Sequence, residues 1–202
     1  SFSDGGEFEN IDKATEHLLK MIEDGADIIE LGAESTKPFS SPVSAEAQLE
    51  KLETLDDDNP RKAKLIAKRQ GLEGLRWQKM TDNEGDESPS SVGAFLIWQQ
   101  PHFIYMAEML YRSKPTKATL NKYKDLLFAT ADFMVSFPSY SSKTKKYNLG
   151  KGLIPAQECF DAITTFNPTY ELAYWSWALN IAQQWKQRLG LQREKQWDEI
   201  IN

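Results

Sequence analysis

The hydrophobic positions after residue 60 recur every three to four residues, which is the spacing of amphipathic helices. Together with capping residues, this pattern predicts five helices, over residues 60–70, 101–112, 117–137, 168–189 and 194–201. Thr116 precedes the third helix as an N-cap, and Asn167 with Pro168 opens the fourth. Gly71 and Gly190 stand where the first and fourth helices should end. The pattern therefore predicts a mainly α-helical fold for this part of the chain.

The first fifty residues follow a different pattern. It predicts a helix, a short strand and a Gly- and Pro-rich loop, over residues 10–24, 26–31 and 32–42. This order of elements is typical of α/β barrels and doubly wound sheets. The composition changes between Lys51 and Asn59, so we expect two domains, residues 1–54 and 55–202.

Composition limits the classes of partner. The chain has 202 residues and a formal net charge of −6, which argues against a nucleic-acid-binding surface. No apolar run is long enough to span a membrane, and Cys159 alone cannot form an intrachain disulfide. The start lacks the features of a signal peptide, so we expect a cytoplasmic protein, although a secreted protein after signal removal would have the same features. The acids at 56–58 fit a solvated helix start better than a metal site, and we expect neither metal nor cofactor.

The loop around Glu158 carries the candidate chemistry. Glu158 is flanked by Pro155, Ala156, Cys159 and Phe160, and these apolar neighbours would disfavour its charged form if they closed around it. A carboxylic acid in such surroundings can serve as a general acid. The alternative is a loop glutamate that caps the next helix.

Other acids are weaker candidates for this role. Asp161 lies three residues beyond Glu158 in the same loop. Glu171 lies in the first turn of a predicted helix, where a carboxylate is favoured without any catalytic role.

Several side chains could line a small-molecule site near this acid. Gln99, Gln100 and His102 offer neutral donors and acceptors. The residues that could provide stacking surfaces are Trp77, Trp98 and Trp175. Core packing is the more common role of such large aromatic residues. A nucleophilic pair of Cys159 with His102 is a minor alternative, because no third group is placed to orient it.

The N-terminal part resembles a known family. The sequences SFSDGG at residues 1–6 and GADIIELGAESTKP at residues 25–38 resemble the opening of dihydropteroate synthase, a TIM barrel that joins a pterin pyrophosphate to p-aminobenzoate. The resemblance implies that Thr36 and Lys37 lie near the substrate. It covers about residues 1–52 and departs at Ala33, where the family usually has Gly, and at Lys37, where it usually has Arg. Lys keeps the charge of Arg but loses its bidentate geometry.

The remainder resembles part of a six-hairpin, (α/α)6-barrel glycosidase of the maltose-phosphorylase-like clan. Three pieces carry this resemblance: AKRQGLEGLRW at 67–77, WQQPHFIY at 98–105, and GLIPAQE at 152–158 followed by TFNP at 165–168. It implies that Glu158 is the general acid of a two-carboxylate site. By the same resemblance, a carbohydrate is the substrate and the binding residues are Trp77, Trp98, Gln99, Gln100, His102, Asn167 and Glu171.

The sequence therefore predicts a mainly α fold, in which a partial six-hairpin (α/α)6 array follows a short helix–strand piece of TIM-barrel type. The leading interpretation is an incomplete carbohydrate-active protein of glycoside hydrolase or phosphorylase lineage. One alternative is a non-catalytic chimeric helical protein that self-associates. A second alternative is a pterin-binding fragment of dihydropteroate synthase. Neither active site is complete, so the sequence does not decide whether the chain is an enzyme.

Overall fold

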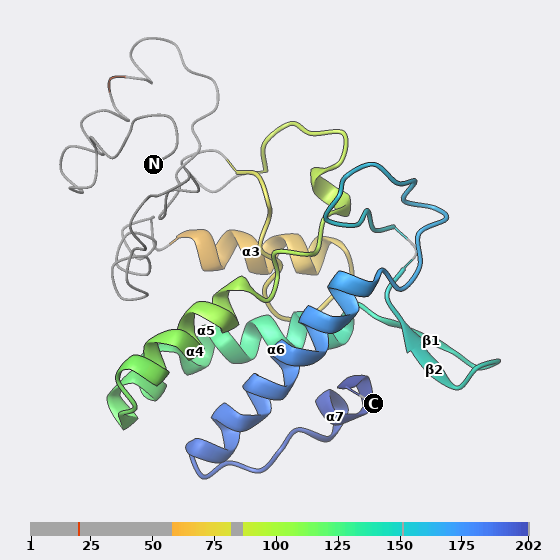
Figure 1. The fold of residues 1–202 in the computed structure, drawn as a ribbon. Helices are drawn as coiled ribbons and strands as arrows, with labels where there is room; N and C mark the ends of the chain where they lie inside the picture. Colours follow the sequence, from red (N-terminus) through yellow and green to blue (C-terminus); the bar gives the residue numbers. More distant parts are fainter. Residues whose placement is uncertain (1–19, 21–57, 82–86, 151, 202) are drawn as a thin grey trace, which may run out of the picture. The chain divides into compact units, whose positions relative to one another are not determined.

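The computed structural model describes residues 20, 58–81, 87–150 and 152–201. The chain divides into two compact units, residues 1–59 with 81–88, and residues 60–80 with 89–202. The second unit holds nearly all the described residues (Figure 1). The predicted helix at 10–24, strand at 26–31 and loop at 32–42 lie outside the described residues. The expectation of a TIM-type piece is therefore not confirmed.

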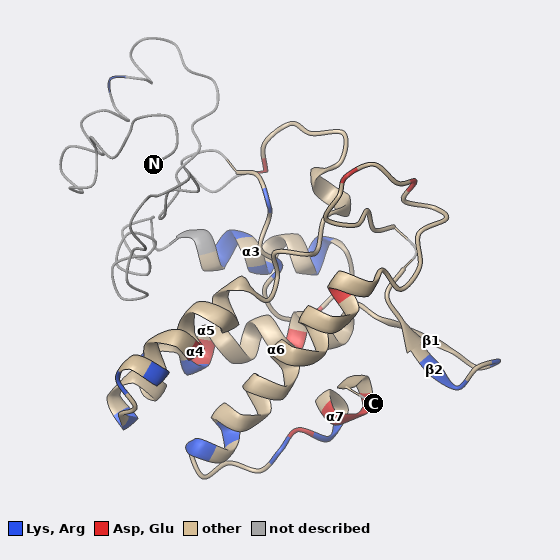
Figure 2. Cartoon of the chain, in the orientation of Figure 1, with Lys and Arg blue, Asp and Glu red and all other residues tan. Residues whose placement is uncertain are grey.

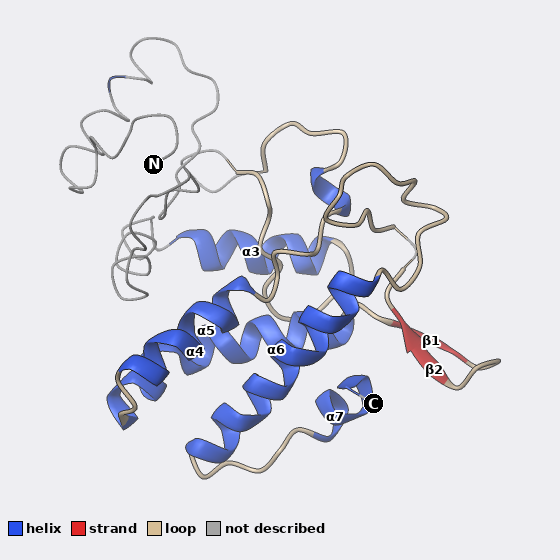
Figure 3. Cartoon of the chain, in the orientation of Figure 1, coloured by secondary structure: helices blue, strands red, loops and turns tan. Residues whose placement is uncertain are grey.

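The described part is mainly helical, as predicted (Figure 3). Its helices are α3 (Asp58–Arg69), the 3-10 helix η1 (Gly93–Phe95), α4 (His102–Ser113), α5 (Lys117–Ser136), α6 (Thr169–Arg188) and α7 (Lys195–Ile201). Its strands are β1 (Ser139–Ser141) and β2 (Lys146–Asn148), which pair antiparallel. Helices α4, α5 and α6 pack against one another, and α7 packs on α5 and α6. This small array does not confirm a six-hairpin barrel.

The core lies between these helices. Its largest fully buried apolar side chains come from every long helix of the array and from the loops beside it, and they include Ile97, Ile104, Leu127, Phe133, Met134, Leu153, Leu179 and Trp185. Burial of each such side chain stabilises the fold by roughly 1.5–3 kcal/mol before chain entropy is counted. Helix α6 contributes buried residues on several sides, as its sequence predicts.

One buried carboxylate joins α4 to α6. The side chain of Glu108 is fully buried, and its Oε2 accepts from Trp185 Nε1 at 2.8 Å and Arg188 Nη1 at 2.6 Å. Its Oε1 accepts from Arg112 Nε at 2.8 Å and Arg188 Nη2 at 3.1 Å. Burial by itself raises the pKa of Glu108, but the hydrogen bonds from Arg188, Arg112 and Trp185 outweigh it and hold the pKa below its ordinary value. The charged form of Glu108 is thus fully paired inside the array.

Helix boundaries agree with the capping signals at most ends. Thr116 Oγ1 accepts from Thr119 N at 3.1 Å, so the predicted N-cap of α5 is confirmed. Gly71 and Gly190 follow α3 and α6 with φ of 72° and 75°, a backbone region that glycine enters without steric cost.

The predicted cap of α6 is wrong. The N-cap position is Pro168, without a side-chain cap, and Asn167 precedes it with φ 49°. Asn167 Oδ1 accepts from Leu149 N at 2.9 Å, and its Nδ2 donates to Asn148 Oδ1 at 2.9 Å. Asn167 therefore links the start of α6 to the end of β2. Its side chain makes these long-range hydrogen bonds instead of capping the helix.

The hairpin of β1 and β2 is not predicted by the sequence pattern. Its strands are mostly exposed and only three residues long, which is too short for an alternating apolar pattern to be recognised. Tyr140 pairs with Tyr147 across the strands, and their ring centroids lie 5.1 Å apart. Such cross-strand aromatic pairs stabilise an exposed hairpin.

Candidate functional site

The two glutamines before α4 position the loop that follows α3. Gln100 Oε1 accepts from Trp77 N at 3.0 Å, and Gln100 Nε2 donates back to Trp77 O. Gln99 Nε2 donates to the same carbonyl at 3.0 Å. Both glutamines are buried. Their amides hold the Trp77 backbone against the start of α4.

The loop that carries Glu158 is held beside the same segment. Ile154 N donates to Phe95 O at 2.9 Å, within an isolated parallel bridge between Leu96 and Ile154. Farther along the loop, Glu158 Oε1 lies 2.6 Å from Lys79 Nζ. Three separate stretches of sequence, 77–79, 95–100 and 154–158, therefore meet at one place.

Glu158 itself is not enclosed by apolar side chains. Its side chain is 34% exposed, and the neighbours Cys159 and Phe160 are exposed as well. Its backbone has φ 59°, an uncommon conformation for a residue other than glycine. The apolar enclosure that we expected around Glu158 is absent, because the loop turns these neighbours outward.

Asp161 organises the next turn of the loop. Its Oδ1 accepts from Ile163 N at 2.8 Å and from Thr164 N at 3.1 Å. These are the local bonds of an aspartate-centred turn. They provide a structural role for this carboxylate.

An aromatic group links α4 to the first turns of α6. His102 Nδ1 lies 3.0 Å from Tyr174 Oη, and the His102 ring meets Trp98 edge-on with centroids 5.3 Å apart. Tyr174 in turn contacts Tyr170 and Trp177, each with a centroid separation of 5.8 Å. Burial lowers the pKa of His102 and raises that of Tyr174, so both side chains are neutral near pH 7.

Glu171 precedes Tyr174 by three residues on α6 and is almost fully buried, with 1% exposure. It occupies the first turn of α6, and its Oε1 accepts from Ala156 N at 2.8 Å. Glu171 Oε2, Gln99 Oε1 and Trp98 Nε1 are buried without a hydrogen-bond partner among the described residues. Buried polar atoms are normally paired with protein or water, so each of these atoms has spare hydrogen-bonding capacity. We call Trp98, Gln99, His102, Glu171 and Tyr174 the polar-aromatic cluster.

The remaining candidate residues have packing roles or lie elsewhere. Trp77 Nε1 donates to Thr130 Oγ1 at 2.9 Å and its ring stacks on Phe103, while Trp175 Nε1 donates to Met134 O at 2.8 Å. Thr36 and Lys37 lie outside the described residues. The binding roles assigned to Trp77, Trp98, Gln99, Gln100, His102, Asn167 and Glu171 stay predictions.

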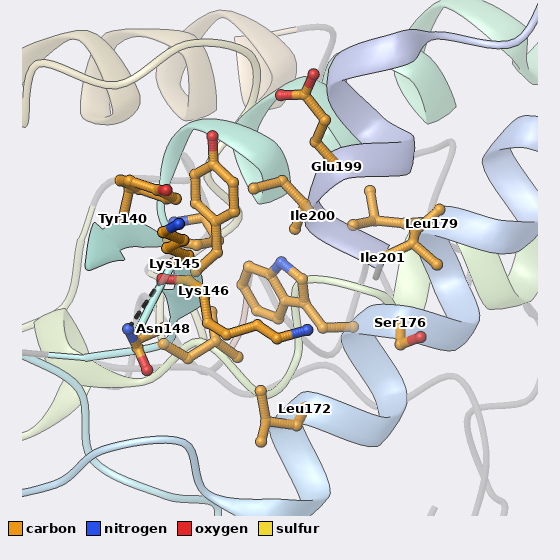
Figure 4. Close-up of a pocket in the computed structure, with 14 residues that line it drawn as sticks. Tyr140, Lys145, Lys146, Asn148, Leu172, Ser176, Leu179, Glu199, Ile200 and Ile201 are labelled. Atoms are coloured by element: carbon orange, nitrogen blue, oxygen red, sulfur yellow. Dashed lines mark hydrogen bonds between the residues drawn. The ribbon is translucent and has the colours of Figure 1, made fainter. Parts of the chain in front are cut away.

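A cleft of about 720 Å³ lies between the hairpin, α6 and α7 (Figure 4). Tyr140, Lys145 and Lys146 line it from the hairpin side, and Trp175 from α6. The cleft depends on the hairpin, which the sequence pattern does not predict. The run of basic and aromatic residues at 145–147 was its only sequence signal.

Within the part of the chain that the structure describes, no three His, Cys, Asp or Glu side chains are grouped to hold a metal ion. No helix among these residues is long and apolar enough to cross a bilayer.

The N-terminal residues are similar to a known protein family. The family described as "Pterin binding enzyme" matches residues 1–57. The mitochondrial folate synthesis bifunctional protein of Arabidopsis thaliana is 50% identical over 52 residues, which are 26% of this chain and 9% of that protein. The dihydropteroate synthases of Clostridium beijerinckii and Bacillus subtilis are 50% and 46% identical over 52 residues, 26% of this chain and 19% and 18% of those proteins. The chain therefore spans less than a fifth of these relatives.

These matches overturn the leading interpretation of the sequence. The resemblance to dihydropteroate synthase is supported, and it favours the pterin-binding alternative over a glycoside hydrolase or phosphorylase. The predicted carbohydrate-active function with Glu158 as its acid is wrong, and the exposed ion pair of Glu158 with Lys79 offers that role no physical support. The six-hairpin resemblance and the chimera are likewise unsupported, and the matching family model covers residues 1–57.

Proposed function

We propose that this chain binds a pterin and that residues 1–57 carry the binding. The observation that supports it is the match of these residues to the pterin-binding family, with 50% identity over 52 residues to a dihydropteroate synthase. The aligned part is 9–19% of the relatives named above. Pterin binding, rather than the whole synthase reaction, is therefore the proposed function of this chain.

Thr36 and Lys37 are the side chains that we assign to the ligand. Both lie in the loop after the predicted strand at 26–31, and loops at the carboxyl ends of strands hold the ligands of α/β barrels. The Lys37 ammonium is a point charge suited to a phosphate group, whereas the Thr36 hydroxyl can donate and accept. We therefore expect a pterin that bears a pyrophosphate to bind more tightly than the bare pterin.

The test is a fluorescence titration of the full chain with pterin and with a pterin pyrophosphate. Lys37→Ala should weaken the pyrophosphate ligand at least about tenfold, the loss of one charge-assisted contact, and should affect bare pterin less. Lys37→Arg should restore binding. Lys20→Ala is the matched control, because Lys20 is an exposed helical lysine outside this loop.

Two outcomes would overturn the proposal. One is the absence of saturable binding of either ligand to the wild-type chain. The other is an equal affinity of the Lys37→Ala and Lys20→Ala variants.

A second candidate function is self-association, supported by exposed apolar side chains. Four of them follow one another along the loop before α6 and into its first turn: Phe160 is 56% exposed, Ile163 73%, Phe166 48% and Tyr170 45%. Grouped exposed apolar residues are typical of interaction surfaces. Light scattering should detect a dimer or larger species, and Ile163→Asp should shift it towards monomer. A wild-type monomer at high concentration would contradict this candidate.

A further inference from the structure

Helix α3 has one buried side and one exposed side. Ala63 and Ala67 are buried, and Ala67 belongs to the core of the helical unit. At 3.6 residues per turn, the opposite side of the helix points away from these alanines. The exposed residues of that side, which we call the basic face of α3, are Lys64, Leu65, Lys68 and Arg69.

Positive charge is concentrated on this helix. Between Asp58 and Glu73 the chain has five Lys and Arg residues and no acid, although its net charge is −6. Lys and Arg mark much of α3 in the charge view (Figure 2). Arg61 and Lys62 already interact within the chain. The charges open to a partner are therefore those of the basic face.

Three basic side chains of this face are unpaired. The side chains of Lys64, Lys68 and Arg69 form no hydrogen bond or ion pair with the residues that the structure describes. Lys64 and Lys68 are four residues apart, so their like charges repel across one turn and destabilise the helix. Cations in the last turn stabilise a helix by themselves, which accounts for Lys68 and Arg69 but not for Lys64. An acidic partner would relieve the repulsion and pair with Lys64.

The spacing of these charges fits an extended acidic segment. Along the helix, the rise is about 6 Å from Lys64 to Lys68 and about 7.5 Å from Lys64 to Arg69. Carboxylates at alternate positions of an extended chain are about 6.6–6.8 Å apart on one side of it. Two such carboxylates can therefore meet two of these cations at once.

Leu65 adds an apolar contact to the basic face. Its side chain is 41% exposed, and it precedes Lys68 and Arg69 by three and four residues, so the three lie together on the helix surface. Exposed ion pairs alone are weak, and an apolar side chain that covers Leu65 adds a hydrophobic contribution. The face thus fits an acidic segment that includes an apolar residue.

The charge of the whole chain favours a short segment over a large polyanion. At physiological ionic strength the Debye length is about 8 Å, so a short segment on α3 is attracted mainly by the cations next to it. A nucleic acid or an anionic bilayer extends farther and meets the excess of acid that gives the chain its net charge of −6.

We propose that the basic face of α3 is a docking surface for an acidic, extended segment of a partner protein. Carboxylates at alternate positions of the segment pair with Lys64 and with Lys68 or Arg69, and an apolar residue covers Leu65. The proposal concerns α3 alone and does not depend on pterin binding by residues 1–57.

The probe is a short fluorescein-labelled peptide with glutamates at alternate positions and one leucine. Fluorescence anisotropy of this peptide, titrated with the full chain, should show saturable binding. The same peptide with glutamine in place of each glutamate should bind at least about tenfold more weakly, because its amides carry no charge. Raising the NaCl concentration from about 0.05 M to about 0.5 M should also weaken the glutamate peptide, because salt screens exposed charges.

Charge reversal on the basic face tests where the peptide binds. Lys64→Glu/Lys68→Glu should weaken the glutamate peptide at least about tenfold, because two attractions become repulsions. Lys114→Glu/Lys117→Glu is the matched control, since it changes the net charge equally at exposed positions between α4 and α5. This control should bind the peptide as the wild type does. Leu65→Ser should weaken binding by about threefold through the loss of the apolar contact.

Three outcomes would overturn the proposal. One is the absence of saturable binding of the glutamate peptide to the wild-type chain. Another is equal affinity of Lys64→Glu/Lys68→Glu and Lys114→Glu/Lys117→Glu. The third is tighter binding of a single-stranded oligonucleotide, or of vesicles that contain phosphatidylserine, through the same lysines. Circular dichroism checks that each variant is folded, and the neutral pair Lys64→Gln/Lys68→Gln replaces the charge reversal if that variant does not fold.

Discussion

Two buried glutamates on neighbouring helices, Glu108 of α4 and Glu171 of α6, differ in how completely they are paired. Glu108 receives four hydrogen bonds, from Arg112, Arg188 and Trp185. Glu171 receives one from Ala156, and its second oxygen has no partner among the described residues. Burial is the same, but the first carboxylate is a structural crosslink and the second belongs to a cluster with unused hydrogen-bonding capacity. Pairing, rather than burial, separates the two roles.

The largest effect should come from breaking the paired carboxylate. Glu108→Gln removes the charge that compensates the half-buried Arg188, so the free energy of unfolding should fall by about 3 kcal/mol. Urea denaturation followed by circular dichroism measures this. Arg112→Ala is the control, because Arg112 is 59% exposed and Arg188 remains paired; its effect should stay below about 1 kcal/mol. A loss under about 1 kcal/mol for Glu108→Gln would remove the distinction between the two glutamates.

His102 of the polar-aromatic cluster should make the stability of the protein depend on pH. Burial lowers the pKa of His102, so below its ordinary value of 6.5 the unfolded chain binds a proton that the folded chain does not. Stability should therefore fall as the pH drops from 7 through 6.5, with a slope of up to about 1.4 kcal/mol per pH unit. His102→Gln should remove this slope, and His17→Gln should retain it. Denaturation midpoints between pH 5 and 7.5 would test this, and an unchanged slope in His102→Gln would contradict it.

Glu108 should change the free energy of unfolding in a lower pH range than His102 does. Its folded pKa lies below the ordinary value of 4.5, so its contribution is complete above that value and is lost as the pH falls through the folded pKa. In Glu108→Gln the decline of stability below pH 4.5 should be shallower than in the wild type. If the two proteins lost stability equally below pH 4.5, Glu108 would not be the group responsible for the loss.

Glu171→Gln should change stability less than Glu108→Gln does. The amide oxygen of glutamine can keep the bond from Ala156 N, and the substitution removes a carboxylate that is only half paired. We expect the free energy of unfolding to change by less than about 1 kcal/mol, measured under the same denaturing conditions. Glu171→Ala is the comparison variant and should cost about 1–2 kcal/mol, because Ala156 N then loses its buried acceptor. A loss as large as that of Glu108→Gln would place Glu171 among the structural carboxylates.

The smallest effect should come from the exposed pair of Lys79 and Glu158. Their side chains are 28% and 34% exposed, so water screens the attraction. Lys79→Met should lower the free energy of unfolding by no more than about 0.5 kcal/mol, in thermal or urea denaturation. A loss above about 1.5 kcal/mol would show that this contact anchors the loop at 154–158.

Local signals predicted the helices well and the contacts of the site poorly. Thr116 begins a helix, and Gly71 and Gly190 end helices, through contacts and backbone angles set within a few residues, so their roles could be predicted from sequence. Asn167 carries the same kind of capping signal, but its side chain binds Leu149 and Asn148 instead. Those partners lie 18 and 19 residues away in sequence, beyond the reach of any capping rule.

Trp98, Gln99, His102 and Glu171 were candidates from the sequence and Tyr174 was not, and the sequence could not show how these side chains are paired. Glu158 was favoured for its apolar sequence neighbours, of which the folded loop buries Pro155 and exposes Cys159 and Phe160. Glu171 was judged a lesser candidate, and folding buries it with one oxygen unpaired. The cleft beside the hairpin left almost no signal, because its walls come from segments more than fifty residues apart in some pairs.

The sequence by itself determined the mainly helical nature of the described residues after 57, most of their helix ends and the resemblance of about residues 1–52 to dihydropteroate synthase. These features depend on periodicity, capping chemistry and similarity, all of which are local in the chain. Only the tertiary structure decided which carboxylate is paired, which is exposed and where a cleft opens. Those properties depend on the distance between atoms from different elements, and packing of the helices sets that distance.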